Sequence, residues 1–233
     1  MHHTASATDQ GKQRAAGIAL IASTIISIVT VAMDVGATGS NKAEVLASMV
    51  SIGVRHQLVH VVALCCLLGF GFGVTALAQR AGLRRAPVLA GLICYLTGCV
   101  AMMGAVLMDG FVTVDLARAY ASAPAADQLI GYNMIQYSYI ILQNLANIAW
   151  MMQALGVLVF STALLRERRV LAMTGLVTGA LPAIAIIATY PQMGLTLVVG
   201  IMLAQSLWHI GAGVSLLRGD VGAGSRMPMA AAA

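Results

Sequence analysis

Apolar stretches of about 20 residues alternate along the chain with short polar segments. An α-helix rises about 1.5 Å per residue, so about 20 apolar residues suffice to cross the hydrocarbon core of a bilayer, which is roughly 30 Å thick. Six stretches reach this length, namely residues 15–33, 56–78, 86–108, 140–165, 170–190 and 194–217. Polar and apolar residues do not alternate one by one within them, as they would in the strands of a membrane barrel. The pattern predicts an all-α polytopic membrane protein with six transmembrane helices.

The composition supports a membrane protein and excludes several other classes. Of the 233 residues, 60% are hydrophobic and 9% are charged, whereas about a quarter of the residues in a soluble domain are charged. A soluble cofactor-binding fold and a secreted disulfide scaffold are therefore excluded, and the lipid bilayer is the expected partner. The net charge is +5, but the basic residues form no continuous stripe, so no nucleic-acid partner is expected.

The basic residues also predict the orientation of the helices. When the six segments are threaded alternately, ten of the 13 lysines and arginines fall on one side of the membrane and three on the other. The ten are Lys12, Arg14, Arg80, Arg84, Arg85, Arg166, Arg168, Arg169, Arg218 and Arg226, and the three are Lys42, Arg55 and Arg118. By the positive-inside rule both termini are cytoplasmic, and residues 35–55, 109–133 and 191–193 form external loops. The expected location is the cytoplasmic (plasma, or inner) membrane.

The domain organisation expected from this pattern is simple. Residues 15–218 form one six-helix transmembrane domain, while the polar or Ala/Gly-rich ends, residues 1–14 and 219–233, are expected to be disordered on the cytoplasmic side. Gly175 and Gly179 form a Gly-x-x-x-Gly pair on the fifth segment. Because such pairs allow helices to approach closely, they make a homo-oligomer plausible.

Polar side chains from four helices are expected near one level of the membrane. Counted at about 1.5 Å per residue from the nearest cytoplasmic arginine, Asp34, His60 and Asn147 lie about 28 to 30 Å away and Asp109 about 36 Å away. His56 lies one helical turn above His60 on the same face. Since ionisable groups are unfavourable inside a membrane, this level, at the external boundary, is the predicted functional pocket.

The residue types in this pocket favour metal binding. Two histidines four residues apart direct both imidazoles the same way, and two carboxylates at the same depth complete a ligand set suited to copper, zinc or iron. His56, His60, Asp34 and Asp109 are the predicted metal ligands. The segment reads His-Gln-Leu-Val-His at 56–60, so it lacks the glutamate of a zinc protease. In the alternative interpretation these four residues are interfacial side chains in contact with water or with the backbone of a neighbouring helix.

Further polar or soft side chains surround this level. Gln143, Asn144 and Asn147 are the predicted substrate-binding residues. Cys65, Cys99 and several methionines lie just below and, with imidazole, are ligands that copper(I) prefers; they also serve as ordinary packing residues. Deeper in the membrane, His209, Gln205 and Gln153 form either a proton or substrate pathway or, as is more common, hydrogen bonds that hold helices together.

Three functional classes follow from these features. The first is an integral membrane enzyme with an external His/Asp pocket that acts on a lipid-soluble small molecule, with His60, Asp109 and Asp34 as catalytic residues. It is either a metal-dependent oxidoreductase or a metal-free acid/base isomerase or cyclase. The second is a small-molecule or ion transporter that uses the same pocket as its outer vestibule. The third is an accessory membrane subunit whose polar level is only a hydrated end.

Overall fold

In the computed structural model, which describes residues 7–191 and 194–218, all regular elements are helical. They are α1 (Ala7–Met33), α2 (Lys42–Ala81), α3 (Ala86–Leu107), the π-helical turn η1 (Met108–Val112), α4 (Thr113–Tyr120), α5 (Ala125–Leu164), α6 (Arg169–Thr189) and α7 (Leu195–Leu217). Because α3, η1 and α4 are continuous, six helical segments are long and apolar enough to cross a membrane. The predicted all-α fold with six membrane-length helices is confirmed, and it is consistent with a helical membrane protein.

The helices are longer than the sequence pattern predicts. The predicted external loops 35–55 and 109–133 are mostly helix, since α2 begins at Lys42, α4 continues α3 as far as Tyr120, and α5 begins at Ala125. Helix α1 begins at Ala7, so residues 7–14, which were predicted to be disordered, are also helical. The remaining residues predicted to be disordered, 1–6 and 219–233, lie outside the described residues, as do residues 192–193 of the third predicted loop.

A capping motif explains why α2 begins so early. Asn41 precedes the helix and accepts a hydrogen bond from the backbone N–H of Glu44 at 3.0 Å. The carboxylate of Glu44 in turn accepts the backbone N–H of Ser40 at 2.8 Å. This reciprocal arrangement satisfies backbone donors that no helical turn can reach, so it favours a helix start at this position.

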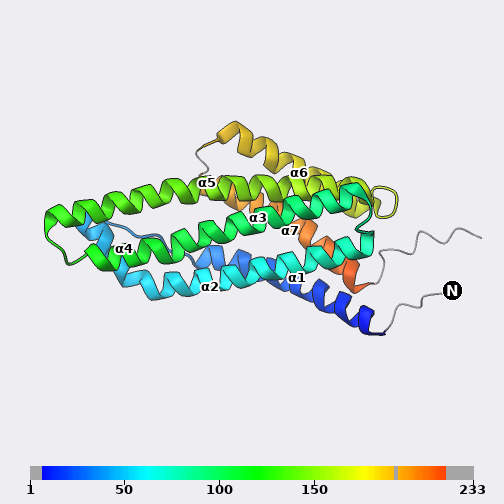
Figure 1. The fold of residues 1–233 in the computed structure, drawn as a ribbon, viewed down its shortest axis with the longest axis horizontal. Helices are drawn as coiled ribbons and strands as arrows, with labels where there is room; N and C mark the ends of the chain where they lie inside the picture. Colours follow the sequence, from blue (N-terminus) through cyan, green and yellow to red (C-terminus); the bar gives the residue numbers. More distant parts are fainter. Residues whose placement is uncertain (1–6, 192–193, 219–233) are drawn as a thin grey trace, which may run out of the picture.

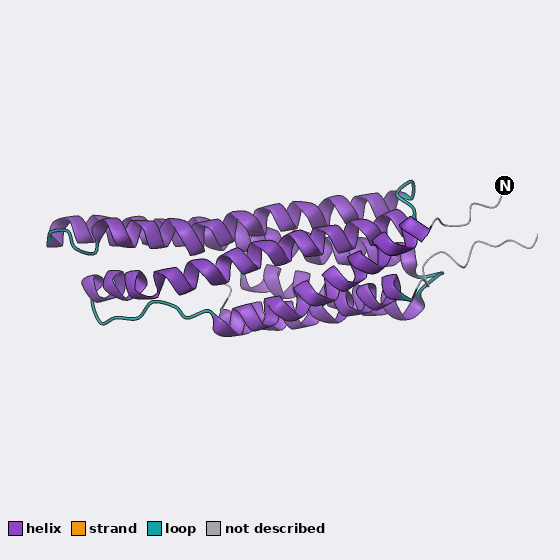
Figure 2. Ribbon diagram, turned by 90° about the horizontal axis from the view of Figure 1, so that it is seen from below, coloured by secondary structure: helices purple, strands orange, loops and turns teal. Residues whose placement is uncertain are grey.

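The N-terminal part of α2, together with α4 and the first turns of α5, extends beyond the other helices (Figure 1). This three-helix extension has a small core of its own, made of Leu46, Met49, Val114, Ala117 and Ile135. The segment between α1 and α2 is not helical and runs along the extension toward its tip (Figure 2). The bundle therefore narrows from all its helices to three at the level where α1 ends.

The main core lies in the six-helix part and is built around Tyr95, Phe160 and Trp208. Helices α3 and α5 approach closely at Gly91, Gly98 and Gly156, where an added Cβ would lie within 3 Å of backbone atoms of the facing helix. Small residues let helices in a membrane pack backbone against backbone, where the dispersion contacts are most numerous. The described ends of the chain, in α1 and α7, lie at the same end of the bundle (Figure 1).

The Gly-x-x-x-Gly pair of α6 packs inside the chain. A Cβ on Gly175 would overlap Ser161 and Trp208, and one on Gly179 would lie 2.7 Å from the carbonyl oxygen of Ala154. Both glycines are buried, Gly175 against α5 and α7 and Gly179 against α5. The pair therefore holds α6 to its own bundle and offers no surface for a second copy, which removes the sequence-based reason for expecting a homo-oligomer.

Candidate functional site

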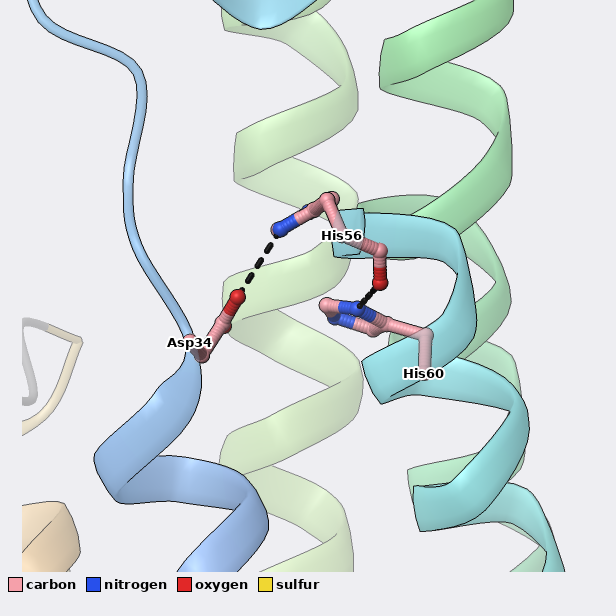
Figure 3. A group of neighbouring side chains, drawn as sticks. All are labelled: Asp34, His56 and His60. Atoms are coloured by element: carbon pink, nitrogen blue, oxygen red, sulfur yellow. Dashed lines mark hydrogen bonds and ion pairs between the residues drawn. The ribbon is translucent and has the colours of Figure 1, made fainter. Parts of the chain in front are cut away.

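Two histidines and two aspartates meet where α1 ends, on α2 and on η1. Asp34 follows the last residue of α1, His56 and His60 lie on α2, and Asp109 lies in η1. Asp34, His56 and His60 can each offer one ligand atom, and these three atoms lie within 4.8 Å of one another (Figure 3). Three of the predicted metal ligands are thus brought together in a group that is able to hold a metal ion, and the fourth, Asp109, contacts both imidazoles.

The ring of His56 lies between the two carboxylates. Its Nδ1 is 2.9 Å from Oδ1 of Asp34, within hydrogen-bond distance. Its Nε2 is 3.7 Å from Oδ1 of Asp109, which is too far for a hydrogen bond. The Nε2 atom is buried and has no hydrogen-bond partner, so one nitrogen of this ring is held in place while the other is left available.

The ring of His60 is oriented by its own helix. Its Nδ1 is 2.8 Å from the carbonyl oxygen of His56, one turn earlier. A carbonyl oxygen only accepts, so Nδ1 carries the proton and donates it. This leaves Nε2 directed at Oδ2 of Asp109, 3.2 Å away. A histidine that donates one nitrogen to the backbone and presents the other to a site is the usual arrangement around protein-bound metals.

The π-helical turn brings Asp109 to the histidines. In η1 the backbone N–H of Thr113 bonds to the carbonyl of Met108, five residues earlier, and the Thr113 hydroxyl donates to the carbonyl of Asp109 instead. The next residue, Gly110, is buried against His60, and an added Cβ would overlap the Cβ of that histidine. Single π-turns inside α-helices are often found at functional sites. Here the turn and the missing side chain together allow the carboxylate to approach the imidazoles.

Asp34 is held at the site by contacts around the end of α1. The guanidinium of Arg55 donates to the carbonyl oxygen of Met33 at 2.9 Å, which satisfies a free carbonyl at the helix end. Farther along the same segment, the backbone N–H of Thr38 donates to Ser48 of α2 at 3.1 Å. Arg55 and Ser48, both on α2, therefore hold the end of α1 and the non-helical segment that follows it.

The imidazoles and the carboxylates differ in exposure. The His56 and His60 side chains are 7% and 8% exposed, whereas those of Asp34 and Asp109 are 32% and 27% exposed. The carboxylates can thus exchange ions and protons with the surroundings, while the imidazoles face the interior of the bundle.

Two of the three predicted substrate-binding residues, Asn144 and Asn147, hydrogen-bond to the turn after α6. The Asn147 amide donates to the carbonyl oxygen of Pro191 at 3.0 Å, and the hydroxyl of Tyr190 donates to Asn144 at 3.2 Å. These contacts attach α5 to the turn after α6. Gln143 is half-buried on the same helix. The depth of Asn147 along its helix does not determine which way the side chain faces. The Asn147 amide therefore bonds to this turn and not to the His/Asp group.

A cavity of about 140 Å³ begins one helical turn below the His/Asp group. Its lining includes Val31, Ala63 and Val106, which lie one turn below Asp34, His60 and Asp109 on their respective helices. It continues between the helices to Gln205 and His209 of α7. This cavity could not be predicted from the sequence, because depth alone does not identify the inward faces of the helices that line it, α1, α2, α3, α5 and α7.

His209 and Gln153, in the deeper polar group, have partners that were not predicted from the sequence. The ring of His209 lies 2.7 Å from the hydroxyl of Tyr95 and stacks on Phe70, with 4.8 Å between ring centroids. Gln153 contacts the sulfur of Cys99 at 3.9 Å. The His209–Tyr95 pair is a buried interhelical hydrogen bond between α7 and α3, as in the packing interpretation of this group.

The cysteines do not join the His/Asp group. Cys65 is exposed and Cys99 is buried beside Gln153, and the metal-capable group among the described residues consists of Asp34, His56 and His60 alone. The donor atoms are thus nitrogen and oxygen, without the thiolates expected for a copper(I) site.

Comparison with known proteins adds no family to this description. No protein-family model, no curated protein and no solved structure matches the chain.

Proposed function

We propose that this protein is a membrane metalloenzyme in which Asp34, His56 and His60 bind one divalent transition-metal ion, with Asp109 as a fourth ligand or as the charged partner of both imidazoles. The single observation that carries the proposal is the convergence of three ligand atoms within 4.8 Å, one helical turn above a cavity. The proposed substrate is a lipid-soluble small molecule. From the distribution of basic residues, we place the centre on the external side of the cytoplasmic membrane.

Two features of the His/Asp group support a metal ion. Nε2 of His56 is buried and makes no hydrogen bond within the described part of the chain, although Oδ1 of Asp109 lies 3.7 Å away, and buried polar atoms in native proteins are normally satisfied. Two carboxylates and two neutral imidazoles also carry a total charge that a divalent cation balances, and such balance is favoured where solvent is partly excluded.

The donor set limits the metal and the reaction. Imidazole nitrogen and carboxylate oxygen suit zinc, iron or copper(II), and three protein ligands leave a coordination position open, as in catalytic sites. A bound metal would supply Lewis acidity, a reactive water or redox chemistry. The Asp109 carboxylate, 3.2 Å from Nε2 of His60 and partly exposed, is placed to accept or return a proton. The reaction class is therefore a metal-dependent oxidoreduction or an acid/base isomerisation or cyclisation.

Elemental analysis of the detergent-purified chain tests the proposal. The parent is expected to retain about one equivalent of zinc, iron or copper, and a His56→Ala/His60→Ala variant none. A Val54→Ala/Leu58→Ala variant is the matched control, because it has the same spacing on the same helix but alters exposed side chains. If none of the three proteins binds metal after reconstitution under reducing conditions, the metalloenzyme proposal fails.

A transporter is the second candidate, favoured by the cavity that leads from the His/Asp group to Gln205 and His209. It predicts flux of a small molecule or ion into vesicles that contain the protein. Asp109→Asn and His209→Phe would both reduce that flux, whereas an enzyme would release product without net transport.

A further inference from the structure

We infer that the cavity below the His/Asp group is a binding site for an uncharged, ring-sized molecule that carries a hydroxyl or carbonyl group, and that Gln205 recognises this group. The inference goes beyond the proposed metal centre, because it rests on other residues and holds whether or not a metal binds above the cavity. A lipid-soluble substrate of the proposed enzyme would be one such molecule.

Gln205 is the residue that carries this inference. It is 1% exposed and lines the cavity, and neither its amide nitrogen nor its amide oxygen has a hydrogen-bond partner among the residues that the structure describes. An amide offers two donors and one acceptor, and leaving all of them unpaired in a membrane interior is strongly unfavourable. A ligand group that both donates and accepts, such as a hydroxyl, would satisfy both ends of this side chain.

Three other polar side chains around the cavity already have hydrogen-bond partners. The hydroxyls of Thr30 and Ser206 each donate to a carbonyl of their own helix at 2.7 Å, and His209 is held by Tyr95. Gln153 has only its long contact with the Cys99 sulfur. Gln205 is therefore where a bound molecule gains most from hydrogen bonding, and Gln153 is the nearest candidate for a second bond.

The size and lining of the cavity define the rest of the ligand. A dry cavity of about 150 Å³ in another protein holds a benzene molecule, and this one measures about 140 Å³. Its walls include Phe70, Met102, Trp150 and Met202, and no Asp, Glu, Lys or Arg of residues 7–191 and 194–218 lines it. An ionised ligand would find no counter-charge there, so the ligand is neutral and largely apolar.

Phenol and toluene are suitable probes, because they are nearly the same size and differ in the hydroxyl group. Binding of each to the full chain in lipid nanodiscs is measured by equilibrium dialysis, with empty nanodiscs subtracted. We expect one saturable site that binds phenol at least about tenfold more tightly than toluene, as expected when a buried amide gains partners. In Gln205→Met, which keeps the length of the side chain but removes its hydrogen bonds, the two probes should bind equally.

Three further proteins complete the test. Gln136→Met, on the exposed face of α5, should keep the preference for phenol, and Ala63→Phe, which fills the cavity, should lose both probes. His56→Ala/His60→Ala should also keep the preference, and Gln205→Met should keep its metal content, so failure here is distinguishable from failure of the metal proposal. A phenol preference that is absent from the parent or that persists in Gln205→Met overturns the inference, as does a parent that binds neither probe because the cavity holds water only.

Discussion

The backbone of Gly110 lies directly against the side chain of His60, with no room between them for a methyl group. This contact makes glycine necessary at the residue after Asp109. It allows η1 to approach α2 closely enough for the Asp109 carboxylate to reach His60, and it gives the first testable prediction.

Gly110→Ala should weaken metal binding without unfolding the bundle. The added Cβ would push η1 away from His60 and lengthen the contact of 3.2 Å between His60 and Asp109. We expect a loss of about 10-fold to 100-fold in metal affinity, the range found when partners of ligating histidines are altered. Competition with a chelator measures it. Gly200→Ala is the control, since a Cβ there meets nothing within 4 Å; equal losses in both variants would contradict the prediction.

Asp34→Asn and Asp109→Asn should each reduce metal affinity while preserving the shape of the side chain. Asp34 holds Nδ1 of His56, and Asp109 faces Nε2 of both histidines. Each substitution removes one negative charge that balances the metal, so a loss of at least about tenfold is expected from either. The two variants are compared by the same chelator titration, and an unchanged affinity in both would exclude the group as a metal site.

Metal occupancy should fall as the pH is lowered. Protons compete with the metal for the imidazole nitrogens and the carboxylates, so binding releases protons and acid favours the metal-free form. Adding metal to the parent in weak buffer should therefore acidify the solution, and His56→Ala/His60→Ala should show no such change. An occupancy that rises with acid would show that these histidines are not the ligands.

Tyr95→Phe should destabilise the bundle by about 1 kcal/mol, because it leaves the buried ring of His209 without its hydrogen bond. Reversible unfolding in mixed detergent gives the free energy. Tyr137→Phe serves as the control, since that side chain is 66% exposed on α5. If both variants unfold alike, the interhelical bond contributes nothing measurable.

Gly175→Leu should destabilise the single chain by more than about 2 kcal/mol, because the new side chain would overlap Ser161 and Trp208. Light scattering should give the same molecular mass for the parent and for any folded variant. A variant that unfolds no more easily but changes its association state would instead place Gly175 at an interface between copies.

The sequence predicts the membrane-length helices well, because about 20 consecutive apolar residues are a strong and local signal. It underestimates their length, since the added turns of α2, α4 and α5 are held by contacts among themselves. One local signal was available: Asn41 followed by Glu44 is a helix-start motif. Recognising it would have moved the start of α2 to the observed residue.

The candidate site could also be predicted only in part from the sequence. Helix depth places Asp34, His60 and Asp109 near one level, and i,i+4 spacing adds His56. Rotation about each helix decides which of these side chains face one another, and depth carries no information about rotation. The hydrogen bond of Asn147 to the turn after α6 and the contact of Tyr95 with His209 were therefore not predicted. The π-turn that brings Asp109 into contact arises from backbone geometry that a hydrophobic pattern does not encode.

The narrowing of the bundle at the end of α1 gives the His/Asp group a direction. The three-helix extension continues beyond the end of α1 (Figure 1). The partly exposed Asp34 directly follows α1, and Asp109 shares His56 with it. A cation that reaches the group would meet the more exposed carboxylates before the buried imidazoles, and would exchange its first water molecules for oxygen and its last for nitrogen. Capture would therefore depend on the charge of the two carboxylates, and retention on the two buried rings.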